Sequence, residues 1–173
     1  GGSEVSTFNV SLNYFDNVGT LKGNGPSYTR YSVGINSDHT LNKFKFGESI
    51  HYTKVDQSFL VGLKDEDIVK YAVYNNPSIP VYDETTIDGY GADDKNINGS
   101  YSMNVIGMNE MIESKTDRYR FIGNLYGQYE FFKGLTYKLS LSFERNDWRD
   151  FFFEPVHNLG WQTPNGDADM EDN

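Results

Sequence analysis

Five segments of the chain alternate apolar and polar residues with a period of two, and this alternation constrains the fold more than any other feature. The apolar positions of the first three segments are Phe8, Val10, Leu12 and Tyr14; Tyr31, Val33 and Ile35; and Phe44, Phe46, Ile50 and Tyr52. Those of the last two are Tyr119, Phe121, Leu125, Tyr129 and Phe131, and Leu135, Tyr137, Leu139, Leu141 and Phe143. Because successive side chains of a β-strand point to opposite sides, each segment is predicted to form a strand with one apolar and one polar face. The predicted strands lie near residues 6–16, 28–37, 43–54, 118–132 and 135–145.

The composition agrees with strands and excludes a membrane-spanning helix. Aromatic residues make up 16% of the chain, and such residues favour strands. The mean hydropathy is -0.63, and no apolar run approaches the roughly 20 residues that a transmembrane helix needs. Strands that cross a membrane also have a low mean hydropathy, because only every second residue faces lipid. The absence of Cys excludes disulfide frameworks, zinc–thiolate sites and cysteine nucleophiles.

The connections between the predicted strands alternate between short and long. The second and third strands are joined tightly near Asp38-His39-Thr40, and the fourth and fifth at Lys133-Gly134. The other connections span residues 17–27, 55–117 and 146–173, and the second of them is far longer than is usual in a compact soluble domain. Short turns on one rim and long loops on the other are typical of outer-membrane barrels. The sequence therefore predicts an all-β fold: residues 1–173 form part of one antiparallel transmembrane β-barrel domain, with the long connections as extracellular loops.

Charge is divided between the strands and the long connections. Residues 56–116 and 146–173 together hold 18 acidic and 5 basic residues, whereas the rest of the chain holds 7 acidic and 10 basic residues. The net charge of -10 argues against a nucleic-acid partner, because the phosphates would be repelled. The acidic outer loops also weakly disfavour an anionic polymer as cargo.

Aromatic residues are expected at both ends of the strands, with aliphatic residues between them. If the first strand runs outward, the outer rim holds Tyr14, Phe15, Tyr28, Tyr31, Tyr52, Tyr119 and Phe121, and the inner rim holds Phe8, Phe44, Phe46, Phe131, Phe132 and Tyr137. Aromatic rims around an aliphatic belt match the two interfaces of a membrane with water. Glu48 conflicts with this pattern, because it shares the parity of Phe46 and Ile50. A β-bulge near Gly47 would rephase it.

Several motifs resemble those of SusC-like TonB-dependent outer-membrane transporters. The segment Phe8-Asn9-Val10-Ser11-Leu12-Asn13-Tyr14-Phe15-Asp16-Asn17-Val18-Gly19 resembles the first barrel strand of that family, and Tyr28-Thr29-Arg30-Tyr31 and Lys43-Phe44-Lys45-Phe46-Gly47 resemble its following strands. Asn76-Pro77-Ser78-Ile79-Pro80-Val81-Tyr82-Asp83 is similar to its NPxxPVYD loop element. Arg120-Phe121-Ile122-Gly123-Asn124-Leu125-Tyr126 and Lys133-Gly134-Leu135-Thr136-Tyr137-Lys138 resemble its next hairpin. The motifs occur in the family's order over nearly the whole chain.

The resemblance implies a protein several times longer than this chain, in the bacterial outer membrane. Such a transporter has a 22-stranded barrel, of which this chain would supply about five strands, a plug domain and a segment that contacts TonB. It works beneath a SusD-like surface lipoprotein and imports a large nutrient, an oligosaccharide or a peptide. No plug domain is recognised in the chain, which opens Gly1-Gly2-Ser3-Glu4 without the pattern of a signal peptide. We therefore expect a segment of a longer protein.

No catalytic constellation is predicted, and the chain is not expected to be an enzyme or to hold a cofactor or metal. His39, His51 and His157 lie in three separate segments, without the spacing of a nucleophile–base pair or a metal site. Two acidic runs, residues 88–94 and 165–172, offer oxygen ligands at alternating positions. They lack the twelve-residue frame of a calcium loop that ends in a bidentate Glu, so solvated acidic loops are the favoured interpretation and calcium the alternative.

Four aromatic residues of the predicted outer loops are candidates for contact with cargo: Tyr90, Tyr101, Trp148 and Trp161. Aromatic rings beside amides and carboxylates suit a polar ligand that is rich in C–H groups. The competing interpretation is that these rings pack the loops together or contact the lipoprotein.

Three functions are consistent with these sequence features. Active import of a large nutrient rests on the ordered motifs and on the asymmetry between turns and loops. A passive outer-membrane porin would show the same strands. A soluble carbohydrate-binding β-sandwich would explain the aromatic residues, but it would bury the apolar faces and would not need a connection of about sixty residues. The nature of the cargo is not encoded in any motif of the chain.

Overall fold

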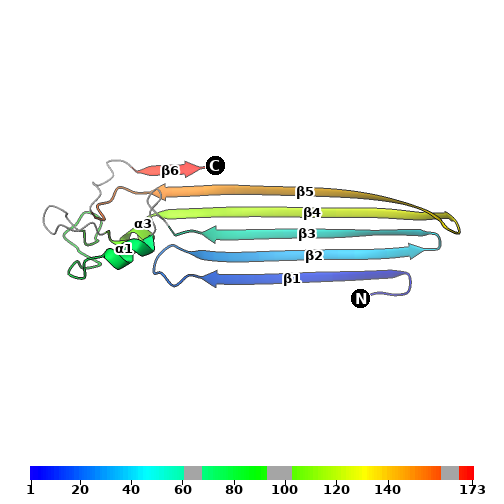
Figure 1. Ribbon diagram of the computed structural model, residues 1–173, viewed down its shortest axis with the longest axis horizontal. Coiled ribbons are helices and arrows are strands. Elements are labelled where there is room, and N and C mark those ends of the chain that lie inside the picture. Colours follow the sequence, from blue (N-terminus) through cyan, green and yellow to red (C-terminus); the bar gives the residue numbers. More distant parts are fainter. Residues whose placement is uncertain (61–67, 93–102, 161–167) are drawn as a thin grey trace. The chain divides into compact units, whose positions relative to one another are not determined.

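The chain forms one sheet of six strands in a computed structural model that describes residues 1–60, 68–92, 103–160 and 168–173 (Figure 1). The strands are β1 (Ser6–Val18), β2 (Ser27–Leu41), β3 (Phe44–Ser58), β4 (Glu113–Phe132), β5 (Leu135–Glu154) and β6 (Asp169–Asp172). The described helices are α1 (Ile68–Tyr74) and α3 (Val105–Met111). Each strand lies beside the next strand of the sequence. The predicted all-β, antiparallel fold is confirmed.

The strands are longer than the alternation of apolar residues predicts. β4 begins at Glu113 instead of near residue 118, and β5 continues to Glu154 instead of ending near residue 145. β2 and β3 are each four residues longer at their ends, and β6 lies in a stretch that was predicted to be loop. Backbone pairing needs no difference between the two faces, so it continues where both faces are polar.

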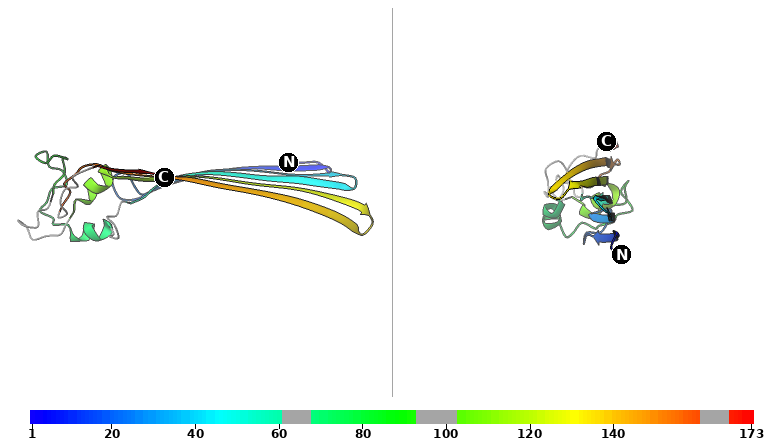
Figure 2. Two further views of the ribbon diagram at one scale, coloured as in Figure 1. Left: turned by 90° about the horizontal axis from the view of Figure 1, so that it is seen from above. Right: turned by 90° about the vertical axis from the view of Figure 1, so that its right-hand side faces the viewer.

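The chain divides into two compact units, which are described separately. Unit 1 comprises Gly1–Asp16, Thr29–Asp56 and Asp117–Trp148, and unit 2 comprises Asn17–Tyr28, Gln57–Thr116 and Arg149–Asn173. Both tight turns belong to unit 1: one contains Asn42 with φ 52°, and the other contains Gly134 with φ 94°. All the long connections belong to unit 2. The strands of unit 1 form a single layer (Figure 2).

Apolar side chains predominate on one side of the unit 1 sheet, which is its apolar face. Ring contacts join Tyr14 to Tyr31 and Phe121 to Phe143, with centroids 5.2 and 6.0 Å apart. The apolar face also carries Glu48, whose carboxylate accepts a hydrogen bond from the Ser37 hydroxyl. Glu48 lines one groove together with Ile50 and Leu125, so it is not rephased by a bulge and stays on the side of its apolar neighbours.

The other side of the unit 1 sheet is the polar face. The Arg120 guanidinium donates to the Glu144 carboxylate at 2.7 Å, from β4 to β5. The Tyr126 hydroxyl donates to Asp38 at 2.5 Å, and Lys138 lies 4.5 Å from the centre of the Tyr126 ring. The Arg120–Glu144 bond joins the neighbouring strands β4 and β5. The Tyr126–Asp38 bond instead passes over Gly47 of β3, because β3 lies between β4 and β2 and Gly47 has no side chain.

Unit 2 holds the compact core of the chain. Its buried hydrophobic residues are Ile68, Tyr71, Met103, Val105, Met108, Ile112 and Leu159, and every buried hydrophobic residue in the described part of the chain belongs to this set. The helices α1 and α3 supply most of them because each buries one face. At the far end of β5, residues Phe151 and Glu154 pair with Asp172 and Asp169 of β6 in antiparallel register.

Neither helix within residues 1–60, 68–92, 103–160 and 168–173 has the length and apolar character to cross a membrane.

Candidate functional site

The apolar face of unit 1 is exposed, although it carries the most hydrophobic residues of the strands. Leu12 is 77% exposed, Leu139 53% and Leu141 60%. Because the unit 1 strands form one layer, no second layer of unit 1 packs on these residues. A contiguous apolar surface of this kind marks a site of contact with a partner or a membrane. It is therefore the first candidate functional surface of the chain.

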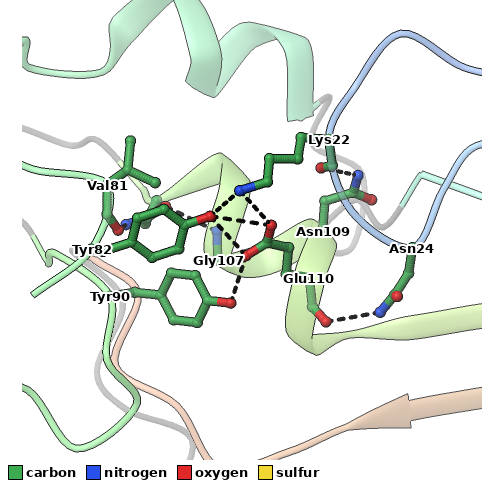
Figure 3. A network of polar contacts seen from close by, with 9 residues as sticks. Lys22, Asn24, Val81, Tyr82, Tyr90, Gly107, Asn109 and Glu110 are labelled. Atoms are coloured by element: carbon green, nitrogen blue, oxygen red, sulfur yellow. Dashed lines mark hydrogen bonds and ion pairs between the residues drawn. The ribbon is translucent and has the colours of Figure 1, made fainter. Parts of the chain in front are cut away.

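A cluster of four polar side chains is the second candidate site, and it lies within unit 2 (Figure 3). The Tyr90 hydroxyl donates to Glu110 Oε2 at 2.8 Å, and the Tyr82 hydroxyl donates to the same oxygen at 3.2 Å. Lys22 forms a salt bridge with Glu110 Oε1 at 3.1 Å and donates a hydrogen bond to the Tyr82 hydroxyl. Three segments far apart in the sequence thus meet at one carboxylate.

The Tyr90 ring also serves the packing of unit 2. It lies 5.6 Å from the Tyr82 ring and packs against the buried core. A Cβ added to Gly107 would come within 2.9 Å of Tyr90 Cδ1, so this α3 residue must be small for the ring to fit. With its hydroxyl bound to Glu110, Tyr90 joins its own loop to α3.

Asn104 holds α3 and the loop around Tyr90 together. Its side-chain oxygen accepts from the Gly107 backbone N–H at 2.9 Å and so caps the helix. Its amide nitrogen donates to the carbonyl oxygens of Val81 and Gly91, at 2.7 and 2.8 Å. The side chain is buried, and its bonds to Gly107 and Gly91 form away from solvent, whereas the bond to Val81 is partly buried.

Two further asparagines fasten the β1–β2 connection to α3. The Asn109 side chain donates to the carbonyl oxygens of Lys22 and Gly25, both at 2.8 Å. Asn24 donates from its side chain to the Glu110 carbonyl at 2.9 Å. Gly23 has φ 124°, and a Cβ there would come within 2.5 Å of the Asn109 carbonyl oxygen. The connection can approach α3 this closely because glycine has no side chain.

The charges of the cluster stabilise one another. Hydrogen bonding from Tyr90, followed by the contact with Lys22, holds the pKa of Glu110 below its usual 4.5. Burial and the bond to Glu110 raise the pKa of Tyr90 to about 12. The hydrogen bond to Tyr82, together with Glu110, raises the pKa of Lys22 above 10.5. At neutral pH the cluster therefore contains an ion pair and a neutral Tyr90.

A third candidate site is an open cavity of about 460 Å³ in unit 2, at the ends of β1, β2 and β3. Its lining includes the amides of Asn17 and Gln57 and the ring of Tyr28. This combination suits a ligand with hydroxyl groups. The sequence analysis did not identify this site, because its residues come from three strand ends and share no motif.

The structure describes two of the four predicted cargo residues. Tyr90 belongs to the cluster of unit 2, and Trp148 lies in β5 at the end of unit 1, not in a loop, with 62% of its surface exposed. Tyr101 and Trp161 lie outside the described residues. His39 lies in β2 and not in a turn.

The described residues contain no group of three His, Cys, Asp or Glu side chains that could hold a metal ion. Each of the two acidic runs lies partly outside the described residues. In the described part of the first run, Asp88 bonds the backbone N–H groups of Tyr90 and Asn158, at 3.1 and 2.7 Å. This carboxylate therefore organises the loop.

The fold defines an antiparallel all-β chain with one exposed apolar face, one polar face and a folded loop region. Comparison with known proteins connects it to one class of receptor: the chain is similar to TonB-dependent receptor P26 of Formosa agariphila, with 32% identity over 132 residues. The match covers 75% of this chain and 12% of that protein, so the chain spans about an eighth of the length of this relative. No protein-family model matches the chain.

Proposed function

We propose that the chain is a segment of the β-barrel of an outer-membrane, TonB-dependent importer of the SusC-like type. The barrel would take up a large nutrient, an oligosaccharide or a peptide, with TonB as energy source and a SusD-like lipoprotein above the outer loops. The similarity to a TonB-dependent receptor and the ordered motifs support this role. Transport, not catalysis, is the proposed activity.

The exposed apolar face is the observation that carries the proposal. Leu139 and Leu141 would be buried in a β-sandwich, because a sandwich packs two sheets through their apolar faces. In unit 1 they are exposed, and the opposite face is polar. A sheet with these two faces fits between hydrocarbon and an aqueous channel.

Cysteine labelling tests the proposed orientation in the full-length protein. Leu141→Cys and Ser142→Cys place thiols on neighbouring positions of β5 and on opposite faces, in a chain that has no cysteine of its own. We expect a lipid-soluble maleimide to modify the first and a water-soluble maleimide to modify the second. Labelling of both positions by the water-soluble reagent alone would remove the basis of the proposal.

Uptake measurements test the energy coupling. Cells that express the full-length protein should lose uptake of its cargo when TonB is deleted, and should regain it when TonB is restored. Uptake that continues without TonB would indicate the passive porin instead. The labelling result is the same for both functions, so the two experiments separate orientation from coupling.

Cargo contact is proposed for the four aromatic residues Tyr90, Tyr101, Trp148 and Trp161, and for the cavity at Asn17, Tyr28 and Gln57. Trp148 is the best test among the described aromatic residues, because its ring is exposed. We expect Trp148→Ala and Gln57→Ala each to lower cargo affinity about fivefold, the loss of one stacking or hydrogen-bonding contact. Trp148→Phe serves as the control, since it keeps an aromatic ring. Unchanged binding in both alanine variants would place cargo contact elsewhere.

A further inference from the structure

A chain of polar side chains crosses the apolar face of unit 1 from β1 to β3. Ser6 Oγ lies 2.9 Å from His39 Nδ1, and His39 Nε2 lies 2.9 Å from Ser37 Oγ. The Ser37 hydroxyl donates to the Glu48 carboxylate. Because Ser37 has only one hydroxyl hydrogen, His39 Nε2 must carry a hydrogen and donate it to Ser37. Ser6 and Ser37 thus hold the two ring nitrogens of His39.

This arrangement orients Glu48 but does not neutralise it. Stacking on Phe46, with centroids 4.7 Å apart, fixes the His39 ring, and His39 in turn fixes the Ser37 hydroxyl. In the described part of the chain, Glu48 forms no salt bridge. An unpaired carboxylate among side chains that face hydrocarbon is costly, and such a group commonly marks a functional site.

A groove of about 330 Å³ begins at Glu48 and extends over β3, β4 and β5 on the same face. Ile50, Leu125, Leu141 and Phe143 line it, and Gly123 lies among them without a side chain. A Cβ at Gly123 would meet only the Phe121 ring within 4 Å, at 3.2 Å from Cε1 and 3.6 Å from Cζ. A side chain at position 123 would therefore occupy part of the groove.

We infer that Glu48 and this groove bind one aminophospholipid, with its ammonium group on the Glu48 carboxylate and an acyl chain in the groove. The inference rests on the proposed function, since it needs lipid against the apolar face. Glu48 lies between Phe46 of the inner aromatic rim and Ile50 of the aliphatic belt. A headgroup at that level would leave its acyl chain pointing toward the middle of the bilayer, along the groove. Charge complementarity selects a headgroup with an amine, because none of the described residues forms a salt bridge with Glu48.

Lipid retention by the full-length protein tests the inference. The protein is reconstituted with equal amounts of phosphatidylethanolamine and phosphatidylglycerol of the same acyl chains, and retained lipids are counted by native mass spectrometry. We expect a preference for phosphatidylethanolamine that Glu48→Gln lowers about fivefold. Glu130→Gln is the matched control, because this exposed carboxylate lies on the polar face. A preference that survives Glu48→Gln, or that Glu130→Gln lowers equally, would overturn the inference.

The groove is tested separately from the charge. Gly123→Val should reduce the retention of both lipids, because the new side chain fills the groove. Gly127→Val is the control, because Gly127 lies on the same strand and has the same parity. We expect it to leave lipid retention unchanged, since a Cβ there meets only Phe44, at an ordinary 3.7 Å. Equal retention in both valine variants would contradict acyl binding in the groove.

If the wild-type protein shows no lipid preference while the Leu141→Cys thiol is still labelled from lipid, the inference fails and the proposed function stands. If that thiol is not labelled from lipid, both fail.

Discussion

Separate segments of the unit 2 loop region contact the Glu110 carboxylate. We therefore expect the ionisation of Glu110 to control the stability of this region against local unfolding. The folded pKa of Glu110 is lower than the usual 4.5, so its contribution is complete above about pH 4.5 and is lost as the pH falls through the folded value. The pKa of Tyr90 is raised to about 12, so its contribution is complete below its usual 10.0 and is lost as the pH rises through 12. Between these limits the cluster should be at its most stable.

We expect Glu110→Gln to destabilise the loop region by about 1 kcal/mol, because it removes a charged acceptor whose side chain is only 22% exposed. Hydrogen exchange of the α3 amides in the full-length protein, measured at pH 7 and at pH 4, would detect the change. The difference between the exchange rates at pH 7 and at pH 4 should be smaller in the variant than in the wild-type protein. Glu84→Gln, at an exposed position of the same loop, should leave both rates unchanged.

We expect substitutions of Asn104 to destabilise the loop region more than Glu110→Gln does, because the bonds of Asn104 to Gly91 and Gly107 are buried. Asn104→Ala removes the partner of the Gly107 N–H and of the Gly91 carbonyl oxygen, whereas the Val81 carbonyl oxygen still accepts from the Gly91 N–H. We expect a loss of about 2 kcal/mol in local stability. Limited proteolysis of the full-length protein would show faster cleavage next to α3. Asn104→Asp keeps the helix cap but loses both donated bonds, so an unchanged cleavage rate in this variant would show that the cap alone matters.

At the scale of the elements, the alternation predicted where apolar strands occur but not how far strands extend. Residues Glu113–Asp117 and Asn146–Asp150 are mostly polar and resemble loops in sequence, yet they belong to β4 and β5. A strand shows alternating hydropathy only where its two faces meet different surroundings. The short β6 and the helix α3 lie in stretches without a pattern of their own, so neither was predicted.

The candidate sites were less predictable than the strands, for a related reason. Lys22, Tyr82, Tyr90 and Glu110 are separated by up to 88 positions, and no spacing rule connects them. Tyr90 was singled out for its aromatic ring, but its role in the cluster depends on the fold of three segments. Glu48 violates the alternation of β3, and that violation is the only sequence signal for the polar chain on the apolar face.

The two faces of β5 should tolerate charge very differently. Leu141→Arg places a guanidinium in the aliphatic belt, and we expect a loss of about 2–4 kcal/mol in folding into lipid. Ser142→Arg points to the polar face and should cost less than about 1 kcal/mol. Folding of the full-length protein into liposomes, followed by the heat-modifiable shift in electrophoretic mobility, would compare the two. Equal losses would mean that the two faces do not meet different solvents.

At the scale of the whole molecule, the position of the buried residues decides what surroundings the chain needs. The buried hydrophobic residues of the described chain lie in unit 2, while the apolar side chains of the unit 1 strands, such as Leu12, Leu139 and Leu141, are exposed. A water-soluble domain would cover such a surface, because exposed apolar patches beyond a few hundred Å² drive association. Unpaired strand edges add to this tendency.

The 173-residue chain alone should therefore not remain a monomer in water. We expect light scattering coupled to size-exclusion chromatography to show heterogeneous, high-mass species without detergent, and the full-length protein to become monodisperse only in detergent. Substituting Leu12, Leu139 and Leu141 together with Ser should shift the isolated chain toward smaller species, because each change removes an exposed apolar side chain. The control is the matched set of substitutions on the polar face, Asn9→Gln, Ser140→Thr and Ser142→Thr. This set should leave the size of the species formed by the isolated chain unchanged. A monodisperse monomer of the unmodified chain in plain buffer would favour a soluble carbohydrate-binding domain and would remove the physical reason for placing the apolar face against lipid.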